Sequence, residues 1–506
     1  MNAHVNVIYG AGGFGTEGVG NFKRLCEGRG AQFESLLPFD SLTLQCSPAS
    51  EHITERHEAS RYIDVNGIEP HDDAASESFT TSMNPDSHQP IIQAHSEVGI
   101  FRALCALTMG ESSRRHTTPH YLWRSLCLDV ARYQASIQEI ERVIDLLALH
   151  GMSVLHLHLT DHQSWRIPVD GFDKLLQSPG CFTWEQLDSL RRYAKQRYLT
   201  LVPEIDMPGH CASLLQRYPE LSGKPSFIHP LVSYIDAHAE ESQRFLQSCA
   251  ASLARVASGD YVHIGGDEVL GMPDSDYDMA MTMFQDAVHD LGLKTIAWQE
   301  GCRGKVTADA YQFWMDRDDI PSEDSLVEAW PKQFSAVAKQ AAAMYALCYD
   351  DPQRLQSKGS PVIDSQQSTM YFDRKYQEPS LVPEQNERMK TLGFPGYAPK
   401  PSQDCLNWTP LSCNQSHDHP TDTAASSVLT RGVEAALWTE TIRSTADLDM
   451  LLLPRLALIA DCAWNGTPEK IAGNPCIEQF DTYAHVWNLC GFHDFYRSSS
   501  LFSDAA

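Results

Sequence analysis

The stretch that decides the fold runs from residue 124 to residue 161 and reads RSLCLDVARYQASIQEIERVIDLLALHGMSVLHLHLTD. It contains an apolar run at residues 126–130, a helical pattern at residues 136–150 and a second apolar run at residues 153–159. Ser136 provides a side-chain oxygen at the helix start and a glutamate follows three residues later, which is the pattern of a capping box. A strand, a helix and a second strand form the repeating unit of a parallel β-sheet.

The same unit continues along the chain, with further helices predicted at residues 183–197, 237–258 and 276–291. Eight strands alternating with helices predict an α/β protein, a (β/α)8 TIM barrel with long loops. Prolines scattered through residues 365–431 predict a large loop there. The predicted strands are residues 126–130, 153–159, 199–205, 261–264, 294–298, 310–313, 360–363 and 433–437.

The chain before the barrel has a different pattern and predicts a small α/β domain. Its expected elements are strands at residues 5–9, 61–65 and 90–94, helices at residues 18–29 and 99–108, and a mobile loop around residues 72–87. We therefore expect a companion domain at residues 1–120, a catalytic barrel at 121–465 and a C-terminal helical cap on the barrel at 466–506.

The composition restricts the class of partner. The formal net charge is −27, so nucleic acid and anionic membranes are not expected as partners. The fourteen cysteines form no C-x-x-C pair, and the N-terminus lacks the basic and apolar regions of an export signal. These features predict a soluble cytoplasmic protein with reduced thiols, and they leave open whether it forms a homodimer.

Chemistry in a TIM barrel collects at the carboxyl ends of the strands. Carboxylates and tryptophans follow several predicted strands, and the run Gly265-Gly266-Asp267-Glu268 follows the fourth. An isolated tryptophan there is often core packing, and an isolated acidic pair is usually a solvated turn. Together, aromatic faces that pack on pyranose rings and carboxylates that accept hydroxyl hydrogen bonds predict a sugar site.

The residues around this run resemble a known family. The segment from Val262 to Val269 matches the signature H-x-G-G-D-E of the family 20 glycoside hydrolases, the β-N-acetylhexosaminidases. Further segments match in the same order, and the resemblance covers roughly residues 120 to 465. These segments are residues 156–161, 203–210, 437–440, 454–456 and 463–464, and residues 99–104 of the preceding domain resemble the family's companion domain.

The resemblance implies an exo-acting, retaining β-N-acetylhexosaminidase that removes terminal β-linked GlcNAc or GalNAc from oligosaccharides, without a cofactor or metal. Glu268 would be the general acid and then the general base. Asp267 would orient the substrate's 2-acetamido group, which replaces an enzymic nucleophile. The negative charge of Asp267 is also expected to help keep Glu268 protonated near neutral pH.

The resemblance also implies the residues that bind the sugar. Tyr371 would donate to the acetamido carbonyl, and Asp161 and His210 would support the acid. The walls of the pocket would be Trp298, Trp314 and Trp438. The sugar hydroxyls would contact Arg124, Asp373 and Glu440. The leaving group would contact Trp408. The chain departs from the family pattern at Ser125, His162 and Gln299, where glycine, aspartate and aspartate are more usual.

Three alternatives remain to be weighed. Residues 10–15 satisfy the dinucleotide pattern G-x-G-x-x-G, but no apolar strand precedes an acidic residue at the required distance, so a glycine-rich turn is favoured. His156 and His158 form the H-x-H of metal-dependent barrel hydrolases, although tryptophans stand where further ligands would be needed. Release of a disaccharide, as by lacto-N-biosidases, would require a pocket open beyond Arg124 and Glu440.

Overall fold

The structure is a computed structural model. It describes residues 6–9, 16–31, 41–46, 77–83, 85–86, 90–94, 96–110, 118–223, 233–316, 335–411, 429–467 and 474–503.

Eight parallel strands close into a barrel in the order β10-β11-β12-β5-β6-β7-β8-β9, which confirms the predicted fold class. All eight strands lie where the sequence pattern placed them, within a few residues at each end. Their bounds are β5 (Trp123–Asp129), β6 (Val154–His158), β7 (Thr200–Glu204), β8 (Tyr261–His263), β9 (Lys294–Trp298), β10 (Ala310–Phe313), β11 (Val362–Asp364) and β12 (Thr430–Leu437).

The barrel interior changes character along its axis. Near the amino ends of the strands, a layer of large and apolar side chains fills it, including Trp123, Val154, Val202, Tyr261 and Ile296. The next layer towards the carboxyl ends is polar and buried, and it is built from histidines and glutamates. The barrel is therefore closed at one end and carries ionisable groups at the other, beneath the loops that form the site.

Helices cover the barrel from outside. Helix α5 (Ile137–Leu149) has the predicted capping box, in which the Ser136 side chain accepts from the backbone of Glu139 and Glu139 reaches back to the backbone of Ser136. Helices α6 (Trp184–Lys195), α8 (Glu240–Val256) and α9 (Asp274–His289) also lie where the apolar spacing predicted them. The shorter helices are α7 (Ala212–Leu215), α11 (Ser335–Ala346), α12 (Asp351–Lys358), α13 (Gln367–Met370), α14 (Pro383–Met389), α15 (Thr445–Leu452) and α16 (Arg455–Asn465).

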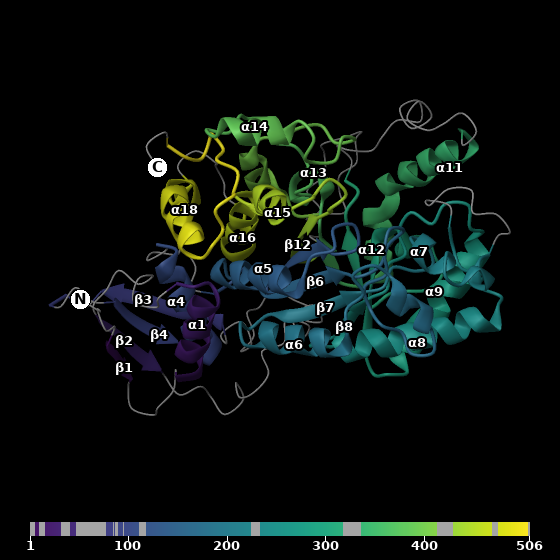
Figure 1. Cartoon of the computed structure of the whole chain (residues 1–506), viewed down its shortest axis with the longest axis horizontal. Coiled ribbons are helices and arrows are strands. Elements are labelled where there is room, and N and C mark those ends of the chain that lie inside the picture. The colour runs from purple at the N-terminus through teal and green to yellow at the C-terminus, as the bar shows by residue number, and fades with distance from the viewer. Residues whose placement is uncertain are drawn as a thin grey trace.

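Residues before the barrel form a four-stranded sheet in the order β1-β2-β4-β3. Strand β3 is antiparallel to β4, and the other pairs are parallel. The sheet and its helices lie on one flank of the barrel (Figure 1). The elements are β1 (Asn6–Tyr9), α1 (Thr16–Gly28), β2 (Ser41–Cys46), β3 (Phe79–Met83), β4 (Pro90–Ala94) and α4 (Glu97–Thr108).

Two expectations for this region need correction. Strand β2 was not predicted, and β3 lies inside the stretch predicted to be a mobile loop. The ring of Phe79 lies 6.0 Å from that of Trp464 on α16, so the barrel domain supplies the apolar surface that orders β3. The predicted strand at 61–65 and the glycine run at 10–15 lie outside the described residues.

The C-terminal part is helical only at its start, in α17 (Pro475–Glu478) and α18 (Phe480–Leu489). Trp487 of α18 donates to His150, which follows α5, at 3.0 Å. The described part of the predicted loop at 365–431 is mainly irregular and includes the short helices α13, α14 and η9 (Ser402–Asn407).

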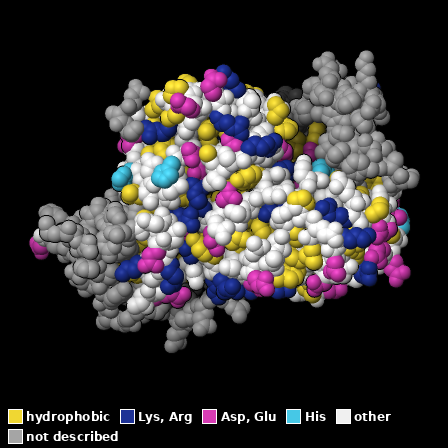
Figure 2. Space-filling model, viewed as in Figure 1, with side chains coloured by type: hydrophobic (Ala, Val, Ile, Leu, Met, Phe, Trp, Pro, Cys, Tyr) yellow, Lys and Arg dark blue, Asp and Glu magenta, His cyan; other side chains and the backbone are white. Residues whose placement is uncertain are grey.

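None of the helices in the described ranges is long and apolar enough to cross a membrane. Acidic and basic side chains are interspersed over the face of the molecule seen in Figure 2.

Candidate active site

The turn after β8 holds the two predicted catalytic carboxyl groups. Gly265 and Gly266 have φ angles of 74° and 104°, and Glu268 has φ of 47°. A Cβ on Gly265 would lie 1.9 Å from Oδ1 of Asp206, so only glycine fits beside that carboxyl group. A non-glycine residue at positive φ stores strain, and such strain is common at functional sites. The sequence therefore folds into a tight turn that presents Asp267 and Glu268 at the barrel mouth.

Glu268 contacts one charged group and one hydrogen-bond donor. Nε2 of His210 lies 3.6 Å from its Oε2, and the hydroxyl of Tyr345 on α11 donates to its Oε1. Burial opposes ionisation of Glu268, but the nearby charged His210, assisted by the hydrogen bond from Tyr345, outweighs it and lowers the pKa of Glu268. The expectation that Asp267 helps keep Glu268 protonated is therefore wrong for the site without substrate.

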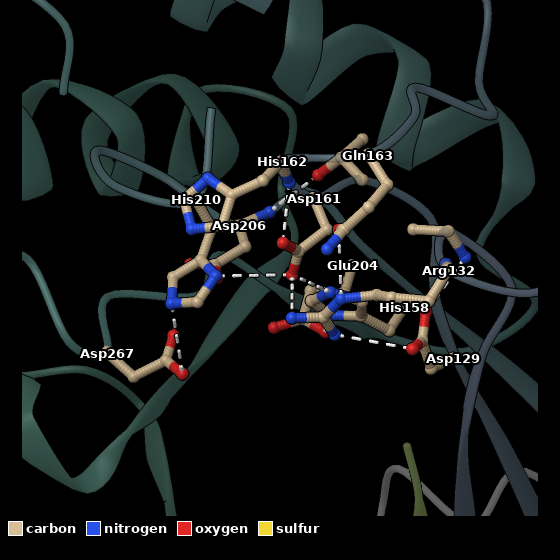
Figure 3. A network of polar contacts seen from close by, with 12 residues as sticks. Asp129, Arg132, His158, Asp161, His162, Gln163, Glu204, Asp206, His210 and Asp267 are labelled. Atoms are coloured by element: carbon tan, nitrogen blue, oxygen red, sulfur yellow. Dashed lines mark hydrogen bonds and ion pairs between the residues drawn. The ribbon is translucent and has the colours of Figure 1, made fainter. Parts of the chain in front are cut away.

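His210 belongs to a row of alternating charges (Figure 3). Its Nδ1 lies 3.2 Å from Oδ2 of Asp161, and that oxygen also accepts from Arg132 at 2.6 Å and from His158 at 2.9 Å. Burial would lower the pKa of His210, but Asp161 and neighbouring carboxylates raise it well above its ordinary value. Burial likewise opposes ionisation of Asp161, yet Arg132 and His210 hold its pKa well below the usual range. The predicted support of the acid by this pair therefore has a geometric basis.

His162, which stands where the family usually has aspartate, packs on His210 with ring centroids 4.6 Å apart. Burial and the charge of His210 lower the pKa of His162 to about 3. His162 is therefore neutral and provides a flat surface for His210.

The polar layer below this row is centred on Glu204 of β7. Its carboxylate accepts from Trp298 at 2.8 Å, is within 2.9 Å of Nδ1 of His263, and contacts His158. His156 lies between Glu204, at 3.2 Å, and Glu434, at 2.8 Å. Two groups in this layer and two at the site have the geometry to hold a metal ion, with ligand atoms within 4.8 Å of one another. Most of the histidine nitrogens of the layer already contact carboxylates.

Four aromatic side chains form the walls of the site. The rings of Trp314 and Tyr371 are nearly parallel, with centroids 6.3 Å apart, and Trp438 lies 5.9 Å from both Trp298 and Tyr371. Trp314 donates to Glu300 at 3.1 Å, and burial raises the pKa of Glu300 to about 8. The structure thus brings together all four aromatic residues that the sequence singled out for the pocket.

Charged side chains gather at the opposite end of the site. Nη2 of Arg132 lies 3.9 Å from Oε1 of Glu440, and its guanidinium lies 5.3 Å from the Trp438 ring centre. Asp373 is buried, and burial with the charge of Glu440 raises its pKa well above the usual range. A cavity of about 510 Å³ lies beyond, lined by Arg132, Glu440, Arg443 and Gln163 among others.

Arg124 lies away from this site, so its predicted contact with sugar hydroxyls is wrong. It is fully buried at the amino end of β5, where it donates to the carbonyls of Gly151 at 2.8 Å and Tyr121 at 2.7 Å. Its guanidinium also forms an ion pair of 2.7 Å with Glu77, a residue that precedes the barrel. Arg124 therefore ties the barrel to the chain before it.

The predicted contact of Trp408 with the leaving group is also wrong. It is completely buried, and its ring packs edge-on against Tyr121, 5.7 Å away, below β5. It follows η9 (Ser402–Asn407), which packs on the outer helix α16. A side chain at this position cannot reach a leaving group.

Sequence reasoning missed Arg132 and Tyr345. Arg132 was detectable, because it follows the carboxyl end of β5 by three residues, on the face where chemistry collects. Tyr345 carries no such signal, since it lies on α11, in the long connection between β10 and β11.

An adjacent carboxylate pair, a charged histidine beside it and tryptophan walls at the carboxyl end of a barrel are the features of a glycoside hydrolase. The model of glycosyl hydrolase family 20, catalytic domain, matches residues 121–467. The chain belongs to glycosyl hydrolase family 20 and is an enzyme of the β-N-acetylhexosaminidase type, which confirms the resemblance seen in the sequence.

Relatives and solved structures agree with this assignment. The chain is similar to a β-N-acetylhexosaminidase of Cellulomonas fimi, with 29% identity over 80% of this chain and 78% of the relative. A β-hexosaminidase of Porphyromonas gingivalis is 26% identical over 71% of this chain and 45% of its own length. The fold is shared with a β-N-acetylhexosaminidase of Streptomyces coelicolor A3(2), at 23% identity and a TM-score of 0.69 over 99% of this chain and 95% of that chain. It is also shared with a Streptomyces plicatus β-hexosaminidase variant in complex with GlcNAc, at 23% identity and a TM-score of 0.69 over 99% and 94%.

Proposed function

We propose that this enzyme removes terminal β-linked N-acetylhexosamine from oligosaccharides, with retention of configuration and with the substrate's acetamido group as nucleophile. The observation that carries the proposal is the turn after β8, which places Asp267 and Glu268 side by side but in different surroundings. Asp267 is nearly buried and faces other carboxyl groups, whereas the side chain of Glu268 is 26% exposed and contacts donors. Two adjacent carboxyl groups with different surroundings suit two different tasks.

In the proposed reaction, the acetamido carbonyl oxygen attacks C1 while the bond from C1 to the glycosidic oxygen breaks. Glu268 gives its proton to the departing oxygen. Asp267 accepts the acetamido N–H and stabilises the positive charge that develops on the cyclised group. Water then attacks C1, gives its proton to Glu268 and opens the ring, so the product keeps the β configuration.

The acid step requires Glu268 to carry a proton, although its pKa is lowered without substrate. We propose that the arriving leaving group displaces the Tyr345 hydroxyl from Glu268. The carboxylate then loses the hydrogen bond that stabilises its ionised form and faces a glycosidic oxygen, which favours the protonated form.

The proposed exo action rests on the end of the site formed by Arg132 and Glu440. Their side chains, 3.9 Å apart, would hold the outer hydroxyls of a terminal sugar and close the pocket. The cavity beyond them favours disaccharide release as a second candidate, because an extended sugar could occupy it. Two rates decide between the candidates. They are the release of the aryl group from aryl β-GlcNAc and from the aryl glycoside of a disaccharide whose GlcNAc residue is linked to the aryl group.

An intracellular site of action is part of the proposal. The cysteines whose side chains the structure describes are all free thiols, which suits a reducing compartment. Short oligosaccharides or glycan fragments are then the substrates that such an enzyme would meet.

The test is a panel of p-nitrophenyl glycosides. The β-GlcNAc and β-GalNAc substrates should release p-nitrophenol and the β-glucoside should not, because only the first two contain the acetamido nucleophile. A thiazoline analogue of GlcNAc should inhibit competitively and much more tightly than GlcNAc, since it resembles the cyclised intermediate. Comparable rates on β-GlcNAc and β-glucoside would refute substrate assistance.

A further inference from the structure

A second carboxyl group, Asp206, lies against the back of Asp267. Asp206 is 1% exposed and follows β7, and its Oδ1 accepts from the backbone N–H of Gly266 at 3.0 Å. Its other oxygen, Oδ2, is buried and has no hydrogen-bond donor in the described part of the chain. The turn that carries Asp267 is therefore built directly on Asp206.

Asp267 also has a carboxylate oxygen without a hydrogen-bond donor in the described structure. Its Oδ1 is also buried without a donor among the described residues, whereas its Oδ2 faces His210 at 3.9 Å. One carboxylate oxygen of Asp206, one of Asp267 and one ring nitrogen of His210 all lie within 4.8 Å of one another. Two carboxylates this close repel each other and neither can donate, so a single proton between them would supply the missing donor.

The groups around the pair favour one negative charge over two. Burial, and then the neighbouring carboxylates, raise the pKa of Asp206 to about 7 despite the charge of His210. Burial and Asp206 raise the pKa of Asp267 well above its ordinary value. The charged and titratable groups that face the pair are Glu204 on β7, Asp161 after β6, Arg132 after β5, His210 in the loop after β7, Glu268 after β8, Tyr277 on α9 and Glu300 after β9.

We propose that Asp206 and Asp267 share one proton, and that Asp206 is a positioning residue that keeps Asp267 ionised towards the substrate. The proton resides on Oδ2 of Asp206 and is donated to Oδ1 of Asp267. Oδ2 of Asp267 then stays an acceptor for the acetamido N–H. This role rests on the proposed substrate-assisted function, whereas the shared proton itself does not.

The kinetic test uses Asp206→Asn and Asp206→Ala with an activated aryl β-GlcNAc substrate, for which proton donation by Glu268 matters least. The asparagine amide can still donate to Asp267, so the acid limb of the kcat/KM profile should stay in place. Alanine removes the donor, so the pKa of Asp267 should rise and the acid limb should move up by about one pH unit, a tenfold loss at the acid end. Two profiles that keep the wild-type shape and differ only in height would overturn the positioning role.

The shared proton is tested without substrate, by urea unfolding of the wild type and Asp206→Asn from pH 5 to pH 9. In the unfolded chain both aspartates ionise near pH 4. A folded-state pKa raised to about 7 means that the folded pair binds the extra proton, and this stability is lost as pH rises through 7. The wild type should therefore lose stability relative to Asp206→Asn between pH 5 and about pH 7, and the difference should then level off.

The matched control is Asp447→Asn. Asp447 pairs with Arg388, and hydrogen bonds that include that guanidinium lower its pKa despite partial burial, so it is ionised in both states throughout this range. Its difference from the wild type should be constant between pH 5 and pH 9. A constant difference for Asp206→Asn as well would overturn the shared proton, whatever the enzyme's substrate proves to be.

Discussion

At the scale of single residues, two arginines close together in the sequence have separate tasks. Arg124 begins β5 and is bonded to backbone carbonyls and to Glu77, whereas Arg132 follows the carboxyl end of β5 and contacts Asp161. Arg132 lies eight positions after Arg124, so the two arginines are located near opposite ends of the strand. The direction of a strand therefore decides which arginine can meet a substrate.

Replacing each arginine separates these tasks. Arg132→Lys should lower kcat/KM on aryl β-GlcNAc by roughly 10- to 100-fold, because hydrogen bonds to charged groups contribute about 1.5–3 kcal/mol and lysine loses the planar fork. Arg124→Met should keep kcat/KM but lower the free energy of unfolding by about 1–3 kcal/mol, since it leaves buried carbonyls without donors. Steady-state kinetics and urea titrations of both variants give the comparison. Equal kinetic losses in the two would place Arg124 back in the site.

Tyr345 offers a second prediction at this scale. Tyr345→Phe removes a donor to the Glu268 carboxylate, so the pKa of Glu268 should rise and its acid form should persist to higher pH. The basic limb of kcat/KM on an alkyl β-GlcNAc glycoside should move up by about one pH unit. Tyr397→Phe is the control, since Tyr397 lies in the same aromatic cluster without a hydrogen bond to Glu268 in the described structure. A basic limb that moves equally in both variants would contradict this role.

At the scale of elements, strands and helices with a clear periodicity of apolar residues could be predicted from the sequence. Functional turns could be predicted only in part. The capping box of α5 and the apolar runs of β9 and β10 are local features, so their bounds agree with the prediction. Strand β3 depends on packing against Trp464, which lies far along the chain, so local sequence could not reveal it. The contact from α11 to Glu268 depends on tertiary structure in the same way.

The tight geometry of the turn after β8 can be tested by substitution of its first glycine. Gly265→Ala places a methyl group at positive φ and 2.5 Å from Cα of Asp206, so the turn must move. A displacement of about 1 Å at reacting groups can cost roughly 100-fold in rate, and we expect at least that loss in kcat/KM. Gly292→Ala is the control, because Gly292 has φ of 76° but its new methyl group would meet no atom within 4 Å. It should lose only about 1–2 kcal/mol of stability and no activity, and similar kinetics in both variants would contradict the steric argument.

At the scale of the whole molecule, the barrel and the enzyme family were predictable because eight repeats and several motifs agree with one another. The site lies where barrel geometry requires it, at the carboxyl ends of β5 to β10 and of β12. The roles of residues outside the clearest motifs could not be predicted in the same way. Arg124 and Trp408 had suitable side chains but lie on the wrong side of the barrel layers, and only the three-dimensional arrangement shows this.

For the reaction as a whole, we expect no metal requirement. EDTA, followed by removal of the chelator, should leave kcat unchanged, because the proposed chemistry uses only carboxyl groups, water and the substrate's acetamido group. His156 and His158 are already engaged with Glu434, Glu204 and Asp161. A loss of activity that Zn²⁺ or another divalent ion restores would favour the metal-dependent hydrolase instead.

The central claim is the division of work between Glu268 and Asp267, and the most direct measurement is kcat/KM for Glu268→Gln and Asp267→Asn on a series of aryl β-GlcNAc substrates. Loss of the acid should depend steeply on leaving-group pKa, because good leaving groups depart unaided, and should approach about 10²–10⁴-fold for poor ones. Loss of Asp267 removes stabilisation of the attacking acetamido group, so all substrates should suffer by a similar factor. A steep dependence for Asp267→Asn with a shallow one for Glu268→Gln would contradict the account and reverse the two roles.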